Sequence, residues 1–228
     1  MKGHSILAHT SALAILVIAS QGSIRADEAT KSAEAEALEE LKWRSIGPAN
    51  MGGRVTDILG VPGDPRVFWV AGADGGLWKT ENAGTTFTAQ FEDQPVYSVG
   101  AIALAPSDHN VLWLGTGEGD PRNSVSYGNG VYRSTQGGRS WTHVGLAGTE
   151  RIKRIVVHPG DPDVAYVCAL GREWGPNEER GVFRTRDGGE TWTKVLYRNE
   201  DTGCSDLALD ESNPRVLYAG MWTHRRKP

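Results

Sequence analysis

The feature that most constrains the fold of this chain is a hairpin pattern that occurs three times. The copies cover residues 76–88, 130–142 and 181–193, so they begin 54 and 51 residues apart. Each copy contains a short alternating strand, a glycine-rich turn and a second strand that opens with a threonine or serine and an aromatic residue. A period of about 50 residues is typical of propeller blades or solenoid turns. The repeat therefore predicts an all-β repeat protein.

The turn within each copy has a consistent chemistry. A serine or threonine hydroxyl and a polar side chain two residues later can accept hydrogen bonds from turn amides, while glycine supplies the positive φ. The aromatic residue after the turn can fold back over its own hairpin. We interpret these residues as structural rather than catalytic. They are Thr80, Asn82, Gly84 and Phe87; Ser134, Gln136, Gly138 and Trp141; and Thr185, Asp187, Gly189 and Trp192.

A second repeated hairpin, an apolar strand, a proline- or aspartate-containing turn and another strand, precedes each glycine-rich hairpin. Joined together, the two hairpins give four antiparallel strands, A to D, which is one blade of a β-propeller. We expect blades at about 52–92, 97–146 and 151–198, and a partial blade at 203–228. A ring needs at least four blades. Residues 41–228 are therefore expected to form an incomplete ring that a C-terminal part of the same protein completes.

The first residues predict export. Residues 1–26 carry Lys2, a short apolar run and small residues up to Ala26, which resembles a secretory signal peptide. Residues 27–40 are expected to form an acidic linker, and residues 41–48 a closing strand whose partners lie at the far end of the ring. The apolar run is too short to span a bilayer. We expect a secreted or periplasmic protein without a membrane span in its mature form.

Alternating strand directions place the B–C loops and the connections between blades on one face, and the glycine-rich turns on the other. The B–C loops at 117–129 and 169–180 are long and contain carboxylates, arginines and aromatic residues. Binding groups concentrate in such loops, so this face is predicted to bind a peptide or a glycan. The candidate binding residues are Glu118, Asp120, Arg122, Asn123, Tyr127, Arg172, Glu173, Trp174, Asn177, Glu178 and Arg180.

The alternative reading of the same charged residues is structural. Glu118 with Arg122, and Glu179 with Arg172 or Arg180, are spaced so that they could form ion pairs that order the loops. Under this reading the carboxylates are not available to a ligand.

The two cysteines also lie near the loop face. Cys168 ends a B strand and Cys204 begins the next A strand, so both strand ends lie on the same face of adjacent blades. Export permits a disulfide. Two separate thiols are the alternative, because a small change of register moves the Cα atoms too far apart.

The sequence resembles a known group of proteins from Trp43 onward. The turn pattern Ser/Thr-x-Asp-x-Gly-x-Thr/Ser-Trp is similar to the Asp box, or bacterial neuraminidase repeat (BNR). The runs at 43–48, 52–55, 75–80 and 174–181 resemble secreted bacterial sortilin-type propeller or glycosyl hydrolase repeat proteins. This resemblance implies a many-bladed propeller at the start of a larger exported chain, and it implies fold more strongly than function.

A more distant resemblance is to two-propeller xyloglucanases, which use two aspartates, one in each propeller, to invert the anomeric centre. Residues 73–79 are similar to the context of the first aspartate, although one residue shorter. The resemblance implies Asp74 as a general base; alternatively, Asp74 only forms a turn before two glycines. The leading hypothesis is an exported binding propeller. The alternative is the N-terminal part of an inverting glycoside hydrolase whose second carboxylate lies outside this chain.

Other functions find no support in the sequence. No His/Cys cluster has zinc spacing, and no phosphate-binding loop or serine nucleophile elbow is present. We therefore predict neither a metal nor a cofactor. The formal net charge is −4 and no basic patch stands out, which argues against a nucleic-acid partner.

Overall fold

The computed structural model describes residues 54–226, and all structural statements below concern this part of the chain. The predicted signal peptide (1–26), acidic linker (27–40) and closing strand (41–48) lie outside it. The strands are β1 (Val55–Val61), β2 (Asp64–Gly72), β3 (Gly76–Thr80), β4 (Thr88–Ala89), β5 (Val99–Ala105), β6 (Asp108–Thr116), β7 (Val131–Ser134), β8 (Thr142–His143), β9 (Ile152–His158), β10 (Asp161–Ala169), β11 (Gly181–Thr185), β12 (Thr193–Leu196), β13 (Thr202–Leu209) and β14 (Leu217–Thr223).

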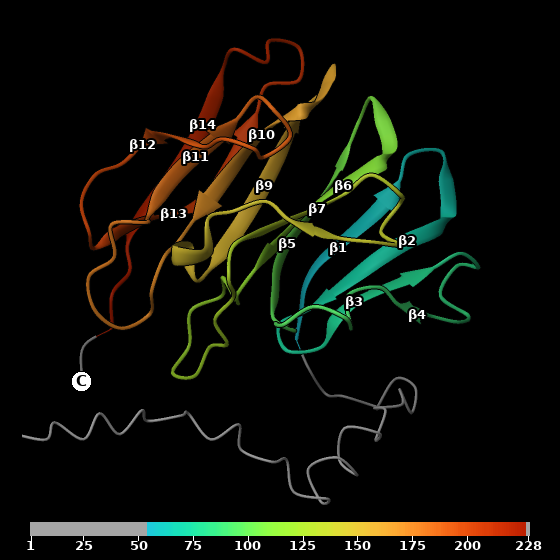
Figure 1. Cartoon of the computed structure of the whole chain (residues 1–228), viewed down its shortest axis with the longest axis horizontal. Coiled ribbons are helices and arrows are strands. Elements are labelled where there is room, and N and C mark those ends of the chain that lie inside the picture. Colours follow the sequence, from blue (N-terminus) through green and yellow to red (C-terminus); the bar gives the residue numbers. More distant parts are fainter. Residues whose placement is uncertain (1–53, 227–228) are drawn as a thin grey trace, which may run out of the picture. The chain divides into compact units, whose positions relative to one another are not determined.

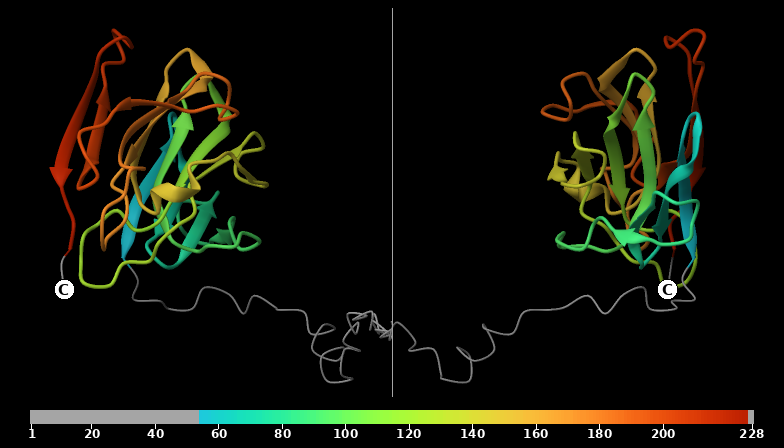
Figure 2. Two further views of the ribbon diagram at one scale, coloured as in Figure 1. Left: turned by 60° about the vertical axis from the view of Figure 1, so that its left-hand side comes forward. Right: turned by 90° about the vertical axis from the view of Figure 1, so that its right-hand side faces the viewer.

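These strands form successive antiparallel sheets. β1–β4, β5–β8 and β9–β12 each make a four-stranded sheet in sequence order, and β13 pairs with β14 alone. Figure 1 shows the sheets as neighbouring blades, with β1, β5, β9 and β13 as adjacent inner strands. Figure 2 shows the same blades from two other sides. The fold is an incomplete β-propeller, as the repeat predicts. The described residues contain no helix long and apolar enough to cross a bilayer.

Apolar clusters between neighbouring blades form the core. Between the second and third blades, Trp113 is fully buried and its indole N–H donates to the carbonyl oxygen of Pro162 (3.2 Å). The inner strands β5 and β9 approach closely at Gly100. A Cβ added to Gly100 would lie 2.1 Å from the carbonyl oxygen of Ile152 and 2.2 Å from that of Gly117. Glycine at position 100 is therefore required by the distance between β5 and β9.

The glycine-rich turns have the predicted hydroxyl chemistry. Ser134 Oγ accepts hydrogen bonds from the backbone amides of Gln136 (3.2 Å) and Gly138 (3.0 Å), and Thr80 and Thr185 act in the same way. The turn in the second blade is held against the start of β6, where Gly137 N donates to the Asn110 carbonyl (2.9 Å). The turns therefore lie at the opposite ends of the B strands from the long loops.

The aromatic residues that follow two of these turns correct the prediction. Trp141 does not cover its own hairpin; its indole N–H donates to the carbonyl of Gln90 in the preceding blade (2.8 Å). Trp192 likewise donates to the carbonyl of Val144 (2.6 Å). Phe87 does pack edge-to-face on a ring of its own blade, at 5.9 Å between centroids. An indole ring is larger than a phenyl ring, and its N–H needs a hydrogen-bond acceptor when it is buried. The neighbouring blade supplies the apolar surface and the carbonyl acceptor.

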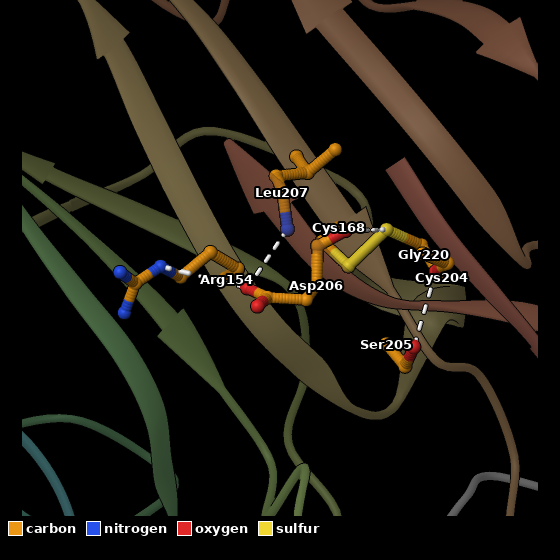
Figure 3. Close-up of a disulfide and its surroundings, with 7 residues drawn as sticks. All are labelled: Arg154, Cys168, Cys204, Ser205, Asp206, Leu207 and Gly220. Atoms are coloured by element: carbon orange, nitrogen blue, oxygen red, sulfur yellow. Dashed lines mark hydrogen bonds and ion pairs between the residues drawn. A yellow bond between two sulfur atoms is a disulfide. The ribbon is translucent and has the colours of Figure 1, made fainter. Parts of the chain in front are cut away.

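A disulfide joins the third blade to the partial fourth blade (Figure 3). Cys168 in β10 and Cys204 in β13 are bonded, with 5.0 Å between their Cα atoms, and both residues are fully buried. Of the two alternatives left open by the sequence, the structure contains the disulfide. The covalent bond fixes the third B–C loop beside the next A strand.

Candidate functional site

The long loops and the connections between blades share one face, which we call the loop face. Backbone bonds run from loop residues to these connections: Gly117 N donates to the Ser98 carbonyl (2.9 Å) and Leu170 N to the Arg151 carbonyl (3.0 Å). The φ of Gly117 is 84°, and a Cβ there would lie 1.9 Å from the carbonyl oxygen of Glu150. Only glycine meets both requirements at this position.

Glu118 is a buried anchor of the 117–130 loop. Its side chain is fully buried and forms ion pairs with Arg54 and Arg122, the latter at 3.5 Å. Asp120 of the same loop pairs with Lys153 of β9. Glu118 thus forms the ion pair with Arg122 that the structural alternative expects, and its role as a ligand contact stays a prediction. Its partner Arg54, 64 residues away, could not be found from local spacing.

Glu173 lies at the centre of a second ionic cluster. It is 4% exposed and contacts Arg151, Arg226 (3.1 Å) and His224 (3.5 Å). Arg226 also donates to the side-chain oxygen of Asn123 (2.7 Å), which connects the 117–130 loop to the last described residues. Burial lowers the pKa of His224, against an opposing effect of Glu173. In this structure, the side chains of Asn123 and Glu173 therefore contact other residues of the chain.

Arg180, predicted as a binding residue, forms hydrogen bonds to the surrounding loops in this structure. Its side chain is fully buried and burial lowers its pKa. The guanidinium donates only to backbone carbonyls: those of Leu170, Arg172, Gly175, Glu200 and His224. These five residues lie outside the strands, so the arginine supplies their carbonyls with hydrogen-bond donors that strand pairing does not provide. Sequence spacing does not show which carbonyls a fold leaves unpaired.

Arg172, Asn177 and Glu178, the other polar residues predicted in the third B–C loop, differ in their partners and exposure. Arg172 is half exposed and pairs through Nε with Glu150 (2.9 Å), rather than with Glu179 as the structural alternative proposed. Asn177 donates to the Gly148 carbonyl (3.1 Å), and Glu178 is exposed. Glu150 and Arg151 are not among the candidate site residues that the sequence predicts. Two charged residues directly before the apolar strand β9 could have indicated them.

Two adjacent hollows open on the loop face. The first, which we call the arginine hollow, has a volume of about 260 Å³. It is lined by Val125, Tyr127, Glu150, Arg151, Arg172, Glu173 and Trp174. The second, the aspartate hollow, has a volume of about 370 Å³. It is lined by Asp74, Pro95, Val96, Tyr97, Ser98, Val125, Ser126 and Tyr127. The tip of the 117–130 loop separates the two.

Aromatic side chains at these hollows are open to solvent. Tyr127 is 72% exposed, Tyr97 60% and Trp174 48%. Asp74 is also exposed and makes no hydrogen bond or ion pair with residues 54–226. Among the described residues that line the hollows, Asp74 is the one unpaired carboxylate. An inverting hydrolase needs two carboxyl groups roughly 6.5–9.5 Å apart, and the hollows do not supply the second.

The opposite face has a different character. A polar hollow of about 460 Å³ there is lined by turn residues, Asn82 and Gln136 among them, and by none of the long-loop residues. The separation of turns and loops agrees with the predicted strand directions. Residues 54–226 contain no group of three His, Cys, Asp or Glu side chains that could hold a metal ion.

No family model matches the chain. Curated relatives are distant. The chain is 23% identical to the oligoxyloglucan-reducing end-specific xyloglucanase of Emericella nidulans over 77% of its own length and 21% of the relative's. It is 25% identical to a xyloglucanase of a Paenibacillus species over 79% of its own length and 18% of the relative's. The chain thus spans about a fifth of the length of these relatives.

Solved structures agree on the fold. An ancestral GH74 enzyme superposes with a TM-score of 0.61 and 24% identity, over 76% of this chain and 23% of that one. The GH74 enzyme of Niastella koreensis gives a TM-score of 0.55 and 20% identity, over 75% and 26%. The solved structures show a β-propeller fold, and the sequence relatives add a distant similarity to xyloglucanases.

Proposed function

We propose that this chain belongs to an exported propeller protein whose loop face binds a glycan. The observation that carries the proposal is the exposure of Tyr127 and Trp174 beside the two hollows. Flat aromatic rings pack against the apolar faces of sugar rings, and polar groups at the rim fix orientation. Export rests on the signal-peptide pattern of residues 1–26, and the turn pattern supports a place among BNR, or Asp-box, propellers.

The names of the relatives suggest the first ligand to test. Two are called xyloglucanases, so oligoxyloglucan is the natural probe for this face. A peptide ligand, the other class that the loop composition allows, is the competing outcome.

Binding is favoured over hydrolysis by the state of the carboxylates. Glu118 and Glu173 are buried in ion pairs, which leaves Asp74 without an acid partner in the described loop face. A second candidate function, inverting hydrolysis with Asp74 as general base, requires a carboxylate from outside residues 54–226. The observation that supports this second function is the exposed, unpaired state of Asp74 within residues 54–226.

The binding proposal is tested by titrating oligoxyloglucan into the full chain and following heat or tryptophan fluorescence. Tyr127→Ala and Trp174→Ala are each expected to weaken binding roughly tenfold, since an aromatic contact contributes about 0.5–1.5 kcal/mol beyond its buried area. Tyr218→Ala is the matched control, because Tyr218 is 65% exposed at the start of β14, away from the loops. Binding that survives both loop variants would contradict the proposed site.

Hydrolysis is tested separately with the same probe. The full chain is expected to release no reducing sugar from oligoxyloglucan, and Asp74→Asn is expected to leave its affinity nearly unchanged. Release by the full chain that disappears in Asp74→Asn would replace the binding function with the hydrolytic one.

A further inference from the structure

We propose that the arginine hollow binds the carboxylate of an acidic sugar, so that the glycan recognised by the loop face carries a uronate residue. The inference rests on the proposed function, because it specifies the ligand of that same face. It begins with the charges that line the hollow.

The charged side chains that line the hollow are two arginines, Arg151 and Arg172, and two carboxylates, Glu150 and Glu173. Glu150 pairs with Arg172, while Glu173 pairs with Arg151 and also with Arg226, which is not part of the lining. Each carboxylate of the lining is thus already paired with an arginine.

Arg172 has the geometry to contact a ligand carboxylate directly. Its side chain is 49% exposed, and Glu150 holds its Nε at 2.9 Å. Its two terminal nitrogens make no hydrogen bond with other residues of the 54–226 region. The guanidinium is therefore held in position while its outer edge stays free. Such an edge binds a carboxylate through two parallel hydrogen bonds.

Arg151 offers a second, independent indication. It lines the hollow and is 1% exposed, with Nε bonded to the Gly171 carbonyl (2.6 Å) and Nη1 to Glu173. Its Nη2 is buried without a hydrogen-bond partner among the described residues. Burial lowers the pKa of this guanidinium to about 10, so it stays charged at neutral pH. A buried donor left unsatisfied is costly, and a carboxylate oxygen is the acceptor that it lacks.

The walls and size of the hollow favour a sugar as the carrier of the carboxylate. Tyr127 and Trp174 are exposed at its rim. Its volume of about 260 Å³ lies near the lower end of small-molecule sites, which begin at roughly 300 Å³. One ring with an attached carboxylate matches both the aromatic rim and the arginines. An inorganic anion would leave the aromatic rim unused.

The test compares trigalacturonic acid with its fully methyl-esterified form, which has the same rings without the charge. The full chain is expected to bind the acid at least tenfold more tightly than the ester, with a preference that weakens as salt is added. Arg172→Gln should remove the preference, because it should weaken binding of the acid far more than binding of the ester. Arg66→Gln is the matched control, because Arg66 is also an exposed arginine paired with one carboxylate, Asp64, but lies at the far end of β2. Unchanged thermal unfolding of both variants shows that the fold is intact.

The outcomes separate this inference from the proposed function. Equal binding of acid and ester, with both weakened by Trp174→Ala, would overturn the uronate site and support glycan binding. Binding of neither sugar, nor of oligoxyloglucan, would overturn both. Preference for the acid that persists in Arg172→Gln would place the carboxylate elsewhere. Tighter binding of a peptide with a free C-terminal carboxylate than of either sugar would also overturn the uronate assignment.

Discussion

Removal of the disulfide should cost this chain a large part of its stability. The bond closes a loop with a sequence separation of 36 residues, and loop-closure entropy in the unfolded chain then predicts about 4 kcal/mol of stabilisation. Typical domains have about 5–15 kcal/mol in total. Because both sulfur atoms lie in an apolar cluster with Val182 and Leu207, the Cys168→Ala, Cys204→Ala double variant is preferred over serine, which would bury a hydroxyl.

The assay is urea unfolding of the oxidised chain and the double variant, followed by tryptophan fluorescence. We expect the free energy of unfolding to fall by about 4 kcal/mol and the m-value to rise, because an uncrosslinked unfolded chain exposes more surface. A reducing agent should lower the midpoint of the wild type and leave the double variant unchanged. A double variant within about 1 kcal/mol of the oxidised wild type would refute the reasoning, as would wild-type protein that contains two free thiols.

Three further predictions concern the inner strands, the contacts between blades and the glycine-rich turns. Gly100→Ala should destabilise the chain by about 3 kcal/mol or more, because the new methyl group meets two carbonyl oxygens. Gly60→Ala is the control: a Cβ at position 60 has no atom within 4 Å, so stability should change by less than about 1 kcal/mol. Equal urea midpoints for the two variants would contradict this prediction. Trp192→Phe removes the indole hydrogen bond to Val144 and should cost about 1–3 kcal/mol in the same assay, and no loss would show that the contact between blades contributes little. Hydrogen bonds from Thr191 lower the pKa of Asp187 to about 2 from an ordinary value near 3.8, so its contribution to stability is complete above pH 4 and is lost as the pH falls toward 2. Asp187→Asn should flatten the pH dependence of the urea midpoint between pH 2 and 4, and an identical slope in both proteins would contradict the assignment.

The local part of the fold was readable from the sequence. Ser134 and Gly138 show why: a hydroxyl and a glycine four residues apart define a turn through bonds that span only that turn. Three such turns at a near-constant spacing, each preceded by a second hairpin, predict four-stranded blades. The strand ends put Cys168 and Cys204 on the same face of adjacent blades, and the structure decided that they form a disulfide.

The contacts between blades depended on the tertiary structure. Nothing in the repeat shows that Trp141 contacts the preceding blade at Gln90, since both its own hairpin and its neighbour offer apolar surface. The side-chain contacts of the loop face also depended on the tertiary structure. The sequence placed Tyr127 and Trp174 on that face, but it could not show that Arg180 would bond to backbone carbonyls of surrounding loops.

The sequence by itself therefore determined the blade, the turn and the face on which the loops lie, because these follow from interactions within about ten residues and from strand alternation. Only the tertiary structure decided which charges are buried. Glu118 and Glu173 are paired with Arg54 and Arg151, at sequence separations of 64 and 22 residues. A carboxylate becomes an anchor or a ligand contact according to which cation the fold brings within reach and how much water it excludes, and both depend on the packing of neighbouring blades.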